Sequence, residues 1–214
     1  MLPLEVKIDL SIVDLLKGEH KSKAYLLINP NSKVPLLEDG TFGLWESHAI
    51  IQYIADKQGD DSLYPSSLQP RADINRWLFW SAYHFTPAVG LISRERISKK
   101  MVGGIGGPDP AEIARGEALL AAAAAQVLDT HLADRQWIAQ DRLTLADLAI
   151  ASPLMHTEAA QLPVAEYVHL QRWFAKVRAL EAWQASEPNR AEELAKRLAL
   201  VSPLTSAPTA QSLE

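Results

Sequence analysis

The chain has 214 residues, which is enough for one domain with a sizeable core or for two small domains. Hydrophobic residues make up 48% of the chain, charged residues make up 22%, and the formal net charge is −5. Because the chain is acidic and has no long basic run, general binding to nucleic acid or to an anionic membrane is not expected.

The chain contains no cysteine, which excludes disulfides, zinc–thiolate sites and a cysteine nucleophile within it. Its first residues lack the basic start and apolar block of a secretory signal, and no run of about 20 apolar residues predicts a membrane span. We therefore expect a cytoplasmic protein that does not cross a membrane. No metal site is expected, since the histidines show no metal-ligand spacing.

The first predicted element is a half-buried β-strand over residues 4–13. Apolar and polar side chains alternate there with the two-residue period of a strand. A polar turn follows at residues 17–21, and a short helical segment is predicted to end near Ile28.

A β-hairpin and a helix are predicted next. Pro35 has no N–H to donate, so it must stand at the start or edge of its strand. Asp39 and Gly40 give a strong hairpin signal between two apolar runs. Ser47 can cap the helix that follows, whose free N–H groups suit a small anionic ligand.

Residues 59–70 are polar and turn-rich, with two prolines, and we predict a linker there. The strand signals stop after it. A long helical pattern covers residues 71–101, and Pro87 is expected to kink or break it. The glycine-rich stretch 102–110 lacks the Lys and Ser/Thr of a phosphate-binding loop and is predicted to be flexible.

Four more helices are predicted, over residues 109–132, 145–160, 167–180 and 192–200, with a tail over residues 201–214. Thr144 and Asp147 match a capping box at the start of the second of these helices. The predicted fold class is thus α/β plus all-α: an α/β domain over residues 1–58, the linker, and an all-helical domain over residues 71–200.

Four motifs then suggest a family. In order, KVPLLEDG, WESHAIIQYIAD, DSLYP and LTLADLAI resemble the cytosolic glutathione S-transferases, especially bacterial members related to the phi, theta and delta groups. The resemblance runs from about residue 2 to residue 183. It implies a thioredoxin-like N-terminal domain and an all-α C-terminal domain, in a homodimer that uses glutathione as co-substrate in detoxification.

The resemblance also implies how the peptide part of glutathione would be held. The Val34–Pro35 peptide bond would be cis and would turn the Val34 backbone toward the cysteinyl residue of the ligand. Ser47 would hold the γ-glutamyl carboxylate at the helix start, and Glu46 would accept from the ligand's ammonium group. For Ser47, a plain helix cap is the alternative interpretation.

Three cations would lie toward the glycyl carboxylate of the ligand: Lys33, His20 and Lys21. For His20 and Lys21 the alternative is a solvated turn. On the helical domain, Trp80, Tyr83 and His84 are candidates for lining a pocket for an apolar electrophile, while core packing is the alternative for the tryptophan and a structural role for the histidine.

The resemblance further implies a strand and a helix ahead of residue 4, carrying the hydroxyl or thiol that activates the glutathione sulfur. The chain begins just after the place of that segment, so no catalytic residue is assigned; Ser11 and Ser32 are the nearest substitutes. Three interpretations are open: a clipped or wrongly assigned start, a strand over residues 4–12 that takes the vacant place, or a natural short form without catalysis.

Two functions of different classes follow. The first is a glutathione transferase that joins the glutathione thiolate to small apolar electrophiles. The second is a catalytically silent glutathione-binding or interaction protein of the same fold. A glutathione-dependent isomerase or disulfide reductase is a third possibility on the same scaffold.

Overall fold

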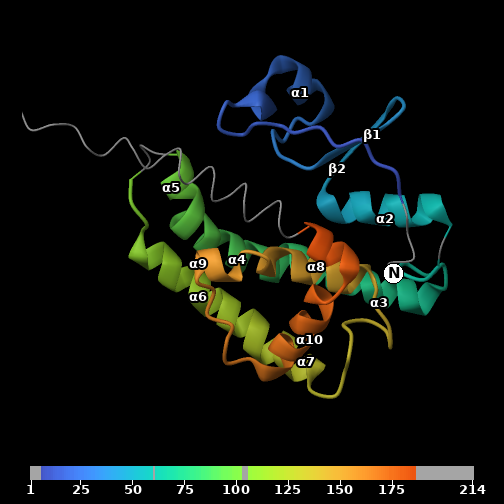
Figure 1. The fold of residues 1–214 in the computed structure, drawn as a ribbon, viewed down its shortest axis with the longest axis vertical. Helices are drawn as coiled ribbons and strands as arrows, with labels where there is room; N and C mark the ends of the chain where they lie inside the picture. The colour runs from blue at the N-terminus through green and yellow to red at the C-terminus, as the bar shows by residue number, and fades with distance from the viewer. Residues whose placement is uncertain (1–5, 60, 103–105, 187–214) are drawn as a thin grey trace, which may run out of the picture.

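The structure is a computed structural model, and it describes residues 6–59, 61–102 and 106–186. Residues 6–59 are called the hairpin unit below, and residues 61–186 the helical unit. The hairpin unit lies on one side of the molecule, and its last helix, residues 47–58, faces the helices of the helical unit that pack beneath it (Figure 1). The elements of the hairpin unit are the 3-10 turn Glu19–Lys21, α1 Lys23–Ile28, β1 Leu36–Asp39, β2 Phe42–Trp45 and α2 Ser47–Gln58.

The predicted hairpin is confirmed. β1 and β2 pair antiparallel, with Leu36 opposite Trp45 and Asp39 opposite Phe42. Gly40 has φ 61°, a left-handed conformation that glycine adopts without steric cost and that the tight turn requires. The Val34–Pro35 peptide bond is cis, as expected from the resemblance.

The predicted strand over residues 4–13 is wrong for the part that the structure describes. Residues 6–13 form no strand, and β1 and β2 make a two-stranded sheet within the described residues. The side chains of Leu10 and Ile12 are 90% and 85% exposed. Alternation predicts a strand only when a neighbouring strand takes up its backbone hydrogen bonds, and no such neighbour lies here among the described residues.

Helix α2 begins one residue earlier than a cap at Ser47 requires. Glu46 occupies the N-cap position with φ 74°, and no side chain caps the helix. Ser47 is therefore the first helical residue, and the prediction that its hydroxyl caps α2 is wrong.

The long helix of the helical unit starts at Leu68, inside the stretch expected to be linker. It runs through α3 Leu68–Trp80, the π-helical turn Ser81–Phe85, α4 Thr86–Ser93, a second π-helical turn Arg94–Ser98 and α5 Lys99–Val102. Backbone angles at the junctions stay helical, so Pro87 does not break the helix. The wider π-turn just before Pro87 accommodates a residue that cannot donate to the preceding turn.

The remaining helices complete the helical unit. They are α6 Pro110–Ala123, the π-helical turn Ala124–Asp129, α7 Thr130–Leu132, α8 Leu145–Leu154, α9 Thr157–Ala160 and α10 Val168–Arg178. The helix expected over residues 145–160 is divided after Pro153. The helix predicted over residues 192–200 and the tail lie outside the described residues.

The capping box at α8 is confirmed and is buried. The Asp147 carboxylate accepts from the Thr144 N–H at 2.8 Å and the Thr144 hydroxyl at 3.0 Å, and also from the Ile138 N–H and the Trp173 indole, both at 2.9 Å. Burial raises the pKa of Asp147, while these donors act to lower it. Four donors on one carboxylate make it a structural centre of the helical unit.

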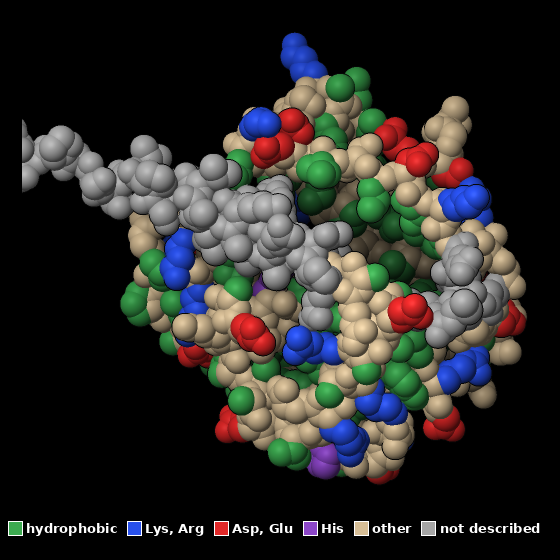
Figure 2. Space-filling model, in the orientation of Figure 1, with side chains coloured by type: hydrophobic (Ala, Val, Ile, Leu, Met, Phe, Trp, Pro, Cys, Tyr) green, Lys and Arg blue, Asp and Glu red, His purple; other side chains and the backbone are tan. Residues whose placement is uncertain are grey.

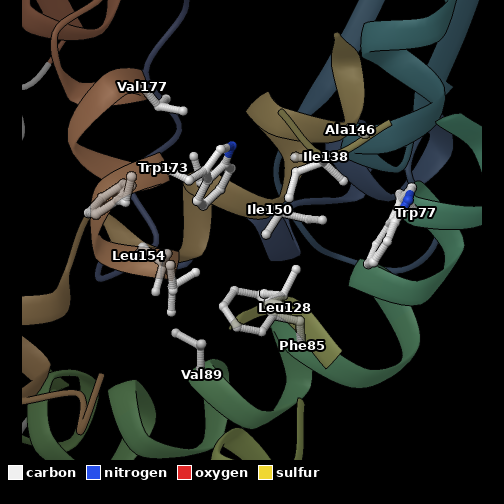
Figure 3. Close-up of a cluster of buried hydrophobic side chains, with 14 of the residues drawn as sticks. Trp77, Phe85, Val89, Leu128, Ile138, Ala146, Ile150, Leu154, Trp173 and Val177 are labelled. Carbon is white, nitrogen blue, oxygen red and sulfur yellow. The ribbon is translucent and has the colours of Figure 1, made fainter. Parts of the chain in front are cut away.

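The core of the molecule lies almost wholly in the helical unit. Figure 3 shows Phe85 of the first π-helical turn converging with side chains of α3, α4, α8 and α10, among them Ile150 and Trp173. Gly116 of α6 lies against α4, where an added Cβ would be 2.8 Å from Ile92 Cγ1. Across the described residues, no helix has both the length and the apolar character to cross a membrane.

Candidate functional site

The hairpin brings its two flanking dipeptides to one end of the sheet. Since Leu36 pairs with Trp45, the residues just before β1 and just after β2 lie at the same end of the two-stranded ladder. These are Val34–Pro35 and Glu46–Ser47, two pairs that sequence reasoning expected to share a ligand. The amino end of α2 therefore opens beside the cis peptide bond.

The loop before Val34 is held by two residues that sequence reasoning missed. The Lys33 carbonyl accepts from the Tyr25 hydroxyl at 2.6 Å and from the Asn29 side-chain amide at 2.7 Å. Asn29 is 1% exposed, and its Oδ1 accepts from the Asn31 N–H at 3.0 Å. A buried asparagine with both ends bonded fixes the backbone on either side of it. No spacing or composition signal marks Asn29, since the partners of its side chain all belong to its own loop.

The expected cations fall on two segments that are tied together. The Ser32 hydroxyl donates to the His20 carbonyl at 2.9 Å, which brings the 3-10 turn Glu19–Lys21 beside the loop that carries Lys33. Within the described residues, His20 Nδ1 is buried and has no hydrogen-bond partner. The side chains of Lys21 and Lys33 are exposed. The Ser32 hydroxyl, a possible substitute for the activating group, is engaged in this tie.

Helix α2 is 12 residues long, and its first N–H groups carry its positive dipole end. The residue after Ser47 is His48, which is partly buried. Burial lowers the pKa of His48, and the negative charge of Glu46 opposes that shift. A neutral imidazole beside the helix start leaves the dipole and the N–H groups as the local attraction for an anion.

The three electrophile-pocket candidates lie around the first π-helical turn. Trp80 is half-buried and stacks on Phe85 at 5.8 Å between ring centroids, so part of its surface belongs to the core. His84 lies 6.3 Å from the Trp80 ring and is exposed. Tyr83 is 76% exposed. The structure thus brings Trp80 and His84 together, with Tyr83 further out on the surface.

A groove of about 760 Å³ lies between β1 and residues 6–11. Its walls are residues 6–11 and 34–39, together with Ile28 from α1 and Tyr53, Ile54 and Lys57 from α2. The space-filling view shows this face of the molecule hollowed, with hydrophobic side chains around the hollow (Figure 2). Within the described residues, the edge of β1 that faces away from β2 pairs with no strand.

No group of three or more metal-ligating side chains is found among the residues that the structure describes.

Comparisons with known proteins agree on one family. The model of the glutathione S-transferase N-terminal domain matches residues 3–56, and the model of the C-terminal domain matches residues 112–181. The crystal structure of human glutathione transferase theta-2, in complex with glutathione and an unknown ligand, is 32% identical, covers 88% of this chain and 76% of that chain, and superposes with a TM-score of 0.73. The chain belongs to the glutathione S-transferase family.

Other members of the family give the same picture. A delta-class glutathione transferase of Nilaparvata lugens is 29% identical, with 92% of this chain and 89% of that chain covered and a TM-score of 0.76. Human glutathione S-transferase theta-2B is 36% identical over 155 residues, 72% of this chain and 63% of that protein. The chain thus spans 63% of the length of that curated relative. The expected fold, a thioredoxin-like N-terminal domain followed by an all-helical one, is confirmed.

Proposed function

We propose that this protein is a glutathione transferase that joins glutathione to small apolar electrophiles. The observation that carries the proposal is the pairing of the cis Val34–Pro35 bond with the start of α2 at one end of the hairpin. Family membership supports it, as do relatives whose structures hold glutathione or lactoylglutathione.

Each part of the tripeptide has a complementary group at this end of the hairpin. Val34 is exposed, and its backbone can pair with the cysteinyl residue as a short added strand. The Ser47 N–H and hydroxyl, at the positive end of α2, suit the γ-glutamyl carboxylate, and Glu46 suits the ammonium group.

The glycyl end of glutathione is a carboxylate and would lie toward the cations. Lys33, His20 and Lys21 come from the two segments joined by the Ser32 hydrogen bond. The exposed side chains of Lys21 and Lys33 are available to this carboxylate, whereas His20 Nδ1 is buried.

The chemistry is nucleophilic substitution or addition by sulfur. Loss of the thiol proton to solvent leaves a thiolate, which forms a carbon–sulfur bond. In a substitution the leaving group departs with its electron pair; in an addition the electron pair of the attacked double bond moves to the neighbouring atom, which takes up a proton from solvent. Donors and positive charge near the sulfur lower the pKa of the thiol and so increase the thiolate fraction at neutral pH. The electrophile would be held by the helical unit around Trp80, His84 and Tyr83, whose rings offer an apolar surface.

A homodimer in the cytoplasm, acting in detoxification, completes the proposal. Exposed aromatic side chains on β2 and α3 support the dimer, because large apolar groups in water favour association: Phe42, Trp45 and Phe79. Sedimentation velocity of the full chain tests the dimer.

The proposal is tested by two assays on the full chain. Titration calorimetry with glutathione measures binding, and conjugation to chlorodinitrobenzene measures turnover. We expect binding in the micromolar to millimolar range and glutathione-dependent release of chloride. Ser47→Ala should weaken glutathione binding by about tenfold, because it removes a hydrogen bond to a charged group.

Ser66→Ala is the matched control, since Ser66 lies in the linker region and bonds to Asp61 instead. It should leave glutathione binding at the wild-type value. Binding without turnover would support the catalytically silent form, and failure of both assays would overturn the glutathione assignment.

A further inference from the structure

Helix α2 is fastened on two neighbouring faces by two similar sets of side chains. On one face, Tyr53 and Lys57 both bond to Asp39 of the hairpin; the Tyr53 hydroxyl donates at 2.6 Å. On the next face, Gln52 and Asp56 bond to the helical unit. Each set is spaced by four residues, so each occupies one side of the helix.

The Gln52 contact is a closed ring of three polar groups. Its side-chain amide donates to the Tyr64 hydroxyl at 3.0 Å and to Asn75 Oδ1 at 2.6 Å, and the Tyr64 hydroxyl donates to the same oxygen at 2.8 Å. The Gln52 amide and the Tyr64 hydroxyl thus both meet acceptors, and Tyr64 is 5% exposed. The ring joins α2, the linker region and α3 at a single point.

A turn further along α2, a second contact supports the ring. The Arg71 guanidinium pairs with both oxygens of Asp56, at 2.7 and 3.2 Å. Its Cζ lies over the Tyr64 ring, 4.1 Å from the ring centroid, and its Nε donates to the Pro65 carbonyl at 2.8 Å. Tyr64 is therefore held at its hydroxyl by Gln52 and Asn75 and on its aromatic face by Arg71. The ring of three hydrogen bonds thus fixes the position of α2 relative to the helical unit.

We propose that Gln52 is a positioning residue that sets where glutathione, held by the hairpin unit, lies relative to the electrophile surface of the helical unit. This inference rests on the proposed function. Gln52 lies five residues after Ser47, about 7.5 Å along the helix axis. The Asp39 contacts join α2 to the hairpin, so Val34 and Ser47 move together when α2 moves. A shift of α2 against α3 then preserves the affinity for glutathione. It changes only which part of the helical unit lies opposite the glutathione sulfur.

The proposal predicts a split between two ligands. Glutathione reports on the hairpin unit alone, whereas S-hexylglutathione also places an apolar chain against the helical unit. In Gln52→Met, which keeps the length and helix propensity of the side chain, the Kd for glutathione should stay within about twofold. The preference for S-hexylglutathione over glutathione should fall by about tenfold, since a small displacement of a positioned group is costly.

The Tyr53→Phe variant is the matched control, because it removes one hydroxyl from the other face of the same helix. It loosens α2 from the hairpin and should raise the Kd for glutathione by about fivefold, with the preference ratio unchanged. Tyr64→Phe, which removes one member of the ring and keeps the stacking on Arg71, should shift the ratio in the same direction as Gln52→Met. It carries the test if Gln52→Met does not fold, as judged by circular dichroism.

Three results would overturn the inference in distinguishable ways. If the wild-type chain does not bind glutathione, the proposed function fails and the inference fails with it. If the wild-type chain binds glutathione but shows no preference for S-hexylglutathione, the helical unit contributes no surface against which Gln52 could position glutathione. If the preference exists and neither Gln52→Met nor Tyr64→Phe reduces it, Gln52 has no positioning role although the site stands.

Discussion

The hairpin unit and the helical unit are stabilised in different ways. Among the described residues, Ile50 and Ala55 are the only buried hydrophobic residues of the hairpin unit, and both lie in α2. The helical unit holds a continuous core around Phe85 and Trp173. Most of the exposed large hydrophobic side chains lie in the hairpin unit, while its described order rests on polar contacts such as those of Asn29 and Asp39. Substitutions in the two units should therefore act through different physics: cavities in one, lost hydrogen bonds in the other.

The largest expected effect separates two tryptophans. Trp173 is fully buried and its indole donates to Asp147, whereas Trp45 on β2 is 39% exposed. Trp173→Ala should lower the free energy of unfolding by about 3–5 kcal/mol through lost burial and an unfilled cavity. Trp45→Ala should cost less than about 1 kcal/mol. Urea unfolding followed by far-UV circular dichroism measures both, and equal losses would contradict the difference between the units.

A smaller effect concerns two glycines in the helical unit. Gly116 packs against α4, where an added Cβ would lie 2.8 Å from Ile92 Cγ1 and 3.4 Å from the Ala88 carbonyl oxygen. Gly116→Ala should therefore cost about 1–3 kcal/mol by overpacking. Around Gly90, within α4, an added Cβ would have no atom within 4 Å apart from its chain neighbours and the backbone of its own helix. Gly90→Ala should instead stabilise by up to about 1 kcal/mol through helix propensity. Destabilisation by both changes would refute the close α4–α6 contact as the cause.

In the hairpin unit, the corresponding effect falls on ligand affinity. Asn29→Ala removes the buried amide that bonds to the Lys33 carbonyl, so the loop before Val34 loses one of its two supports. We expect a loss of about 1 kcal/mol in glutathione binding, or roughly fivefold in Kd.

The control for this change is Asn31→Ala. The Asn31 backbone N–H keeps its bond to Asn29 Oδ1, and only a 3.3 Å side-chain bond is lost. Titration calorimetry should give a Kd near that of the wild type. If Asn29→Ala binds glutathione equally well, the loop is held by Tyr25 alone.

Local rules predicted the elements whose stability is local. Asp39–Gly40 predicted the turn, and Thr144 with Asp147 predicted the start of α8, because turn conformation and capping depend on a few adjacent residues. The family resemblance predicted the cis bond before Pro35. The arrangement of Val34–Pro35 and Glu46–Ser47 then follows from hairpin register, which the turn fixes.

Elements that depend on distant partners were not predicted. Residues 6–13 alternate like a strand and form none in the described structure, since pairing is a property of neighbours and not of the segment. Pro87 was expected to kink or break the helix, but the helix widens into a π-turn just before Pro87 and continues. The ring of Gln52, Tyr64 and Asn75 joins three segments, and nothing in their spacing marks them as a group.

The smallest expected effect depends on pH and belongs to α2, where the two units meet. Burial lowers the pKa of His48, against the opposing charge of Glu46. The unfolded chain thus binds this proton more readily, and folding is disfavoured as pH falls below about 6.5, the ordinary value for histidine; above that pH the penalty is absent. His48→Gln should match the wild-type urea midpoint at about pH 7.5 and lose less stability by about pH 5.5. Glu46→Gln should steepen the fall, because burial then lowers the pKa of His48 without opposition. An unchanged pH slope in both variants would mean that His48 is equally solvated in the folded and unfolded chain.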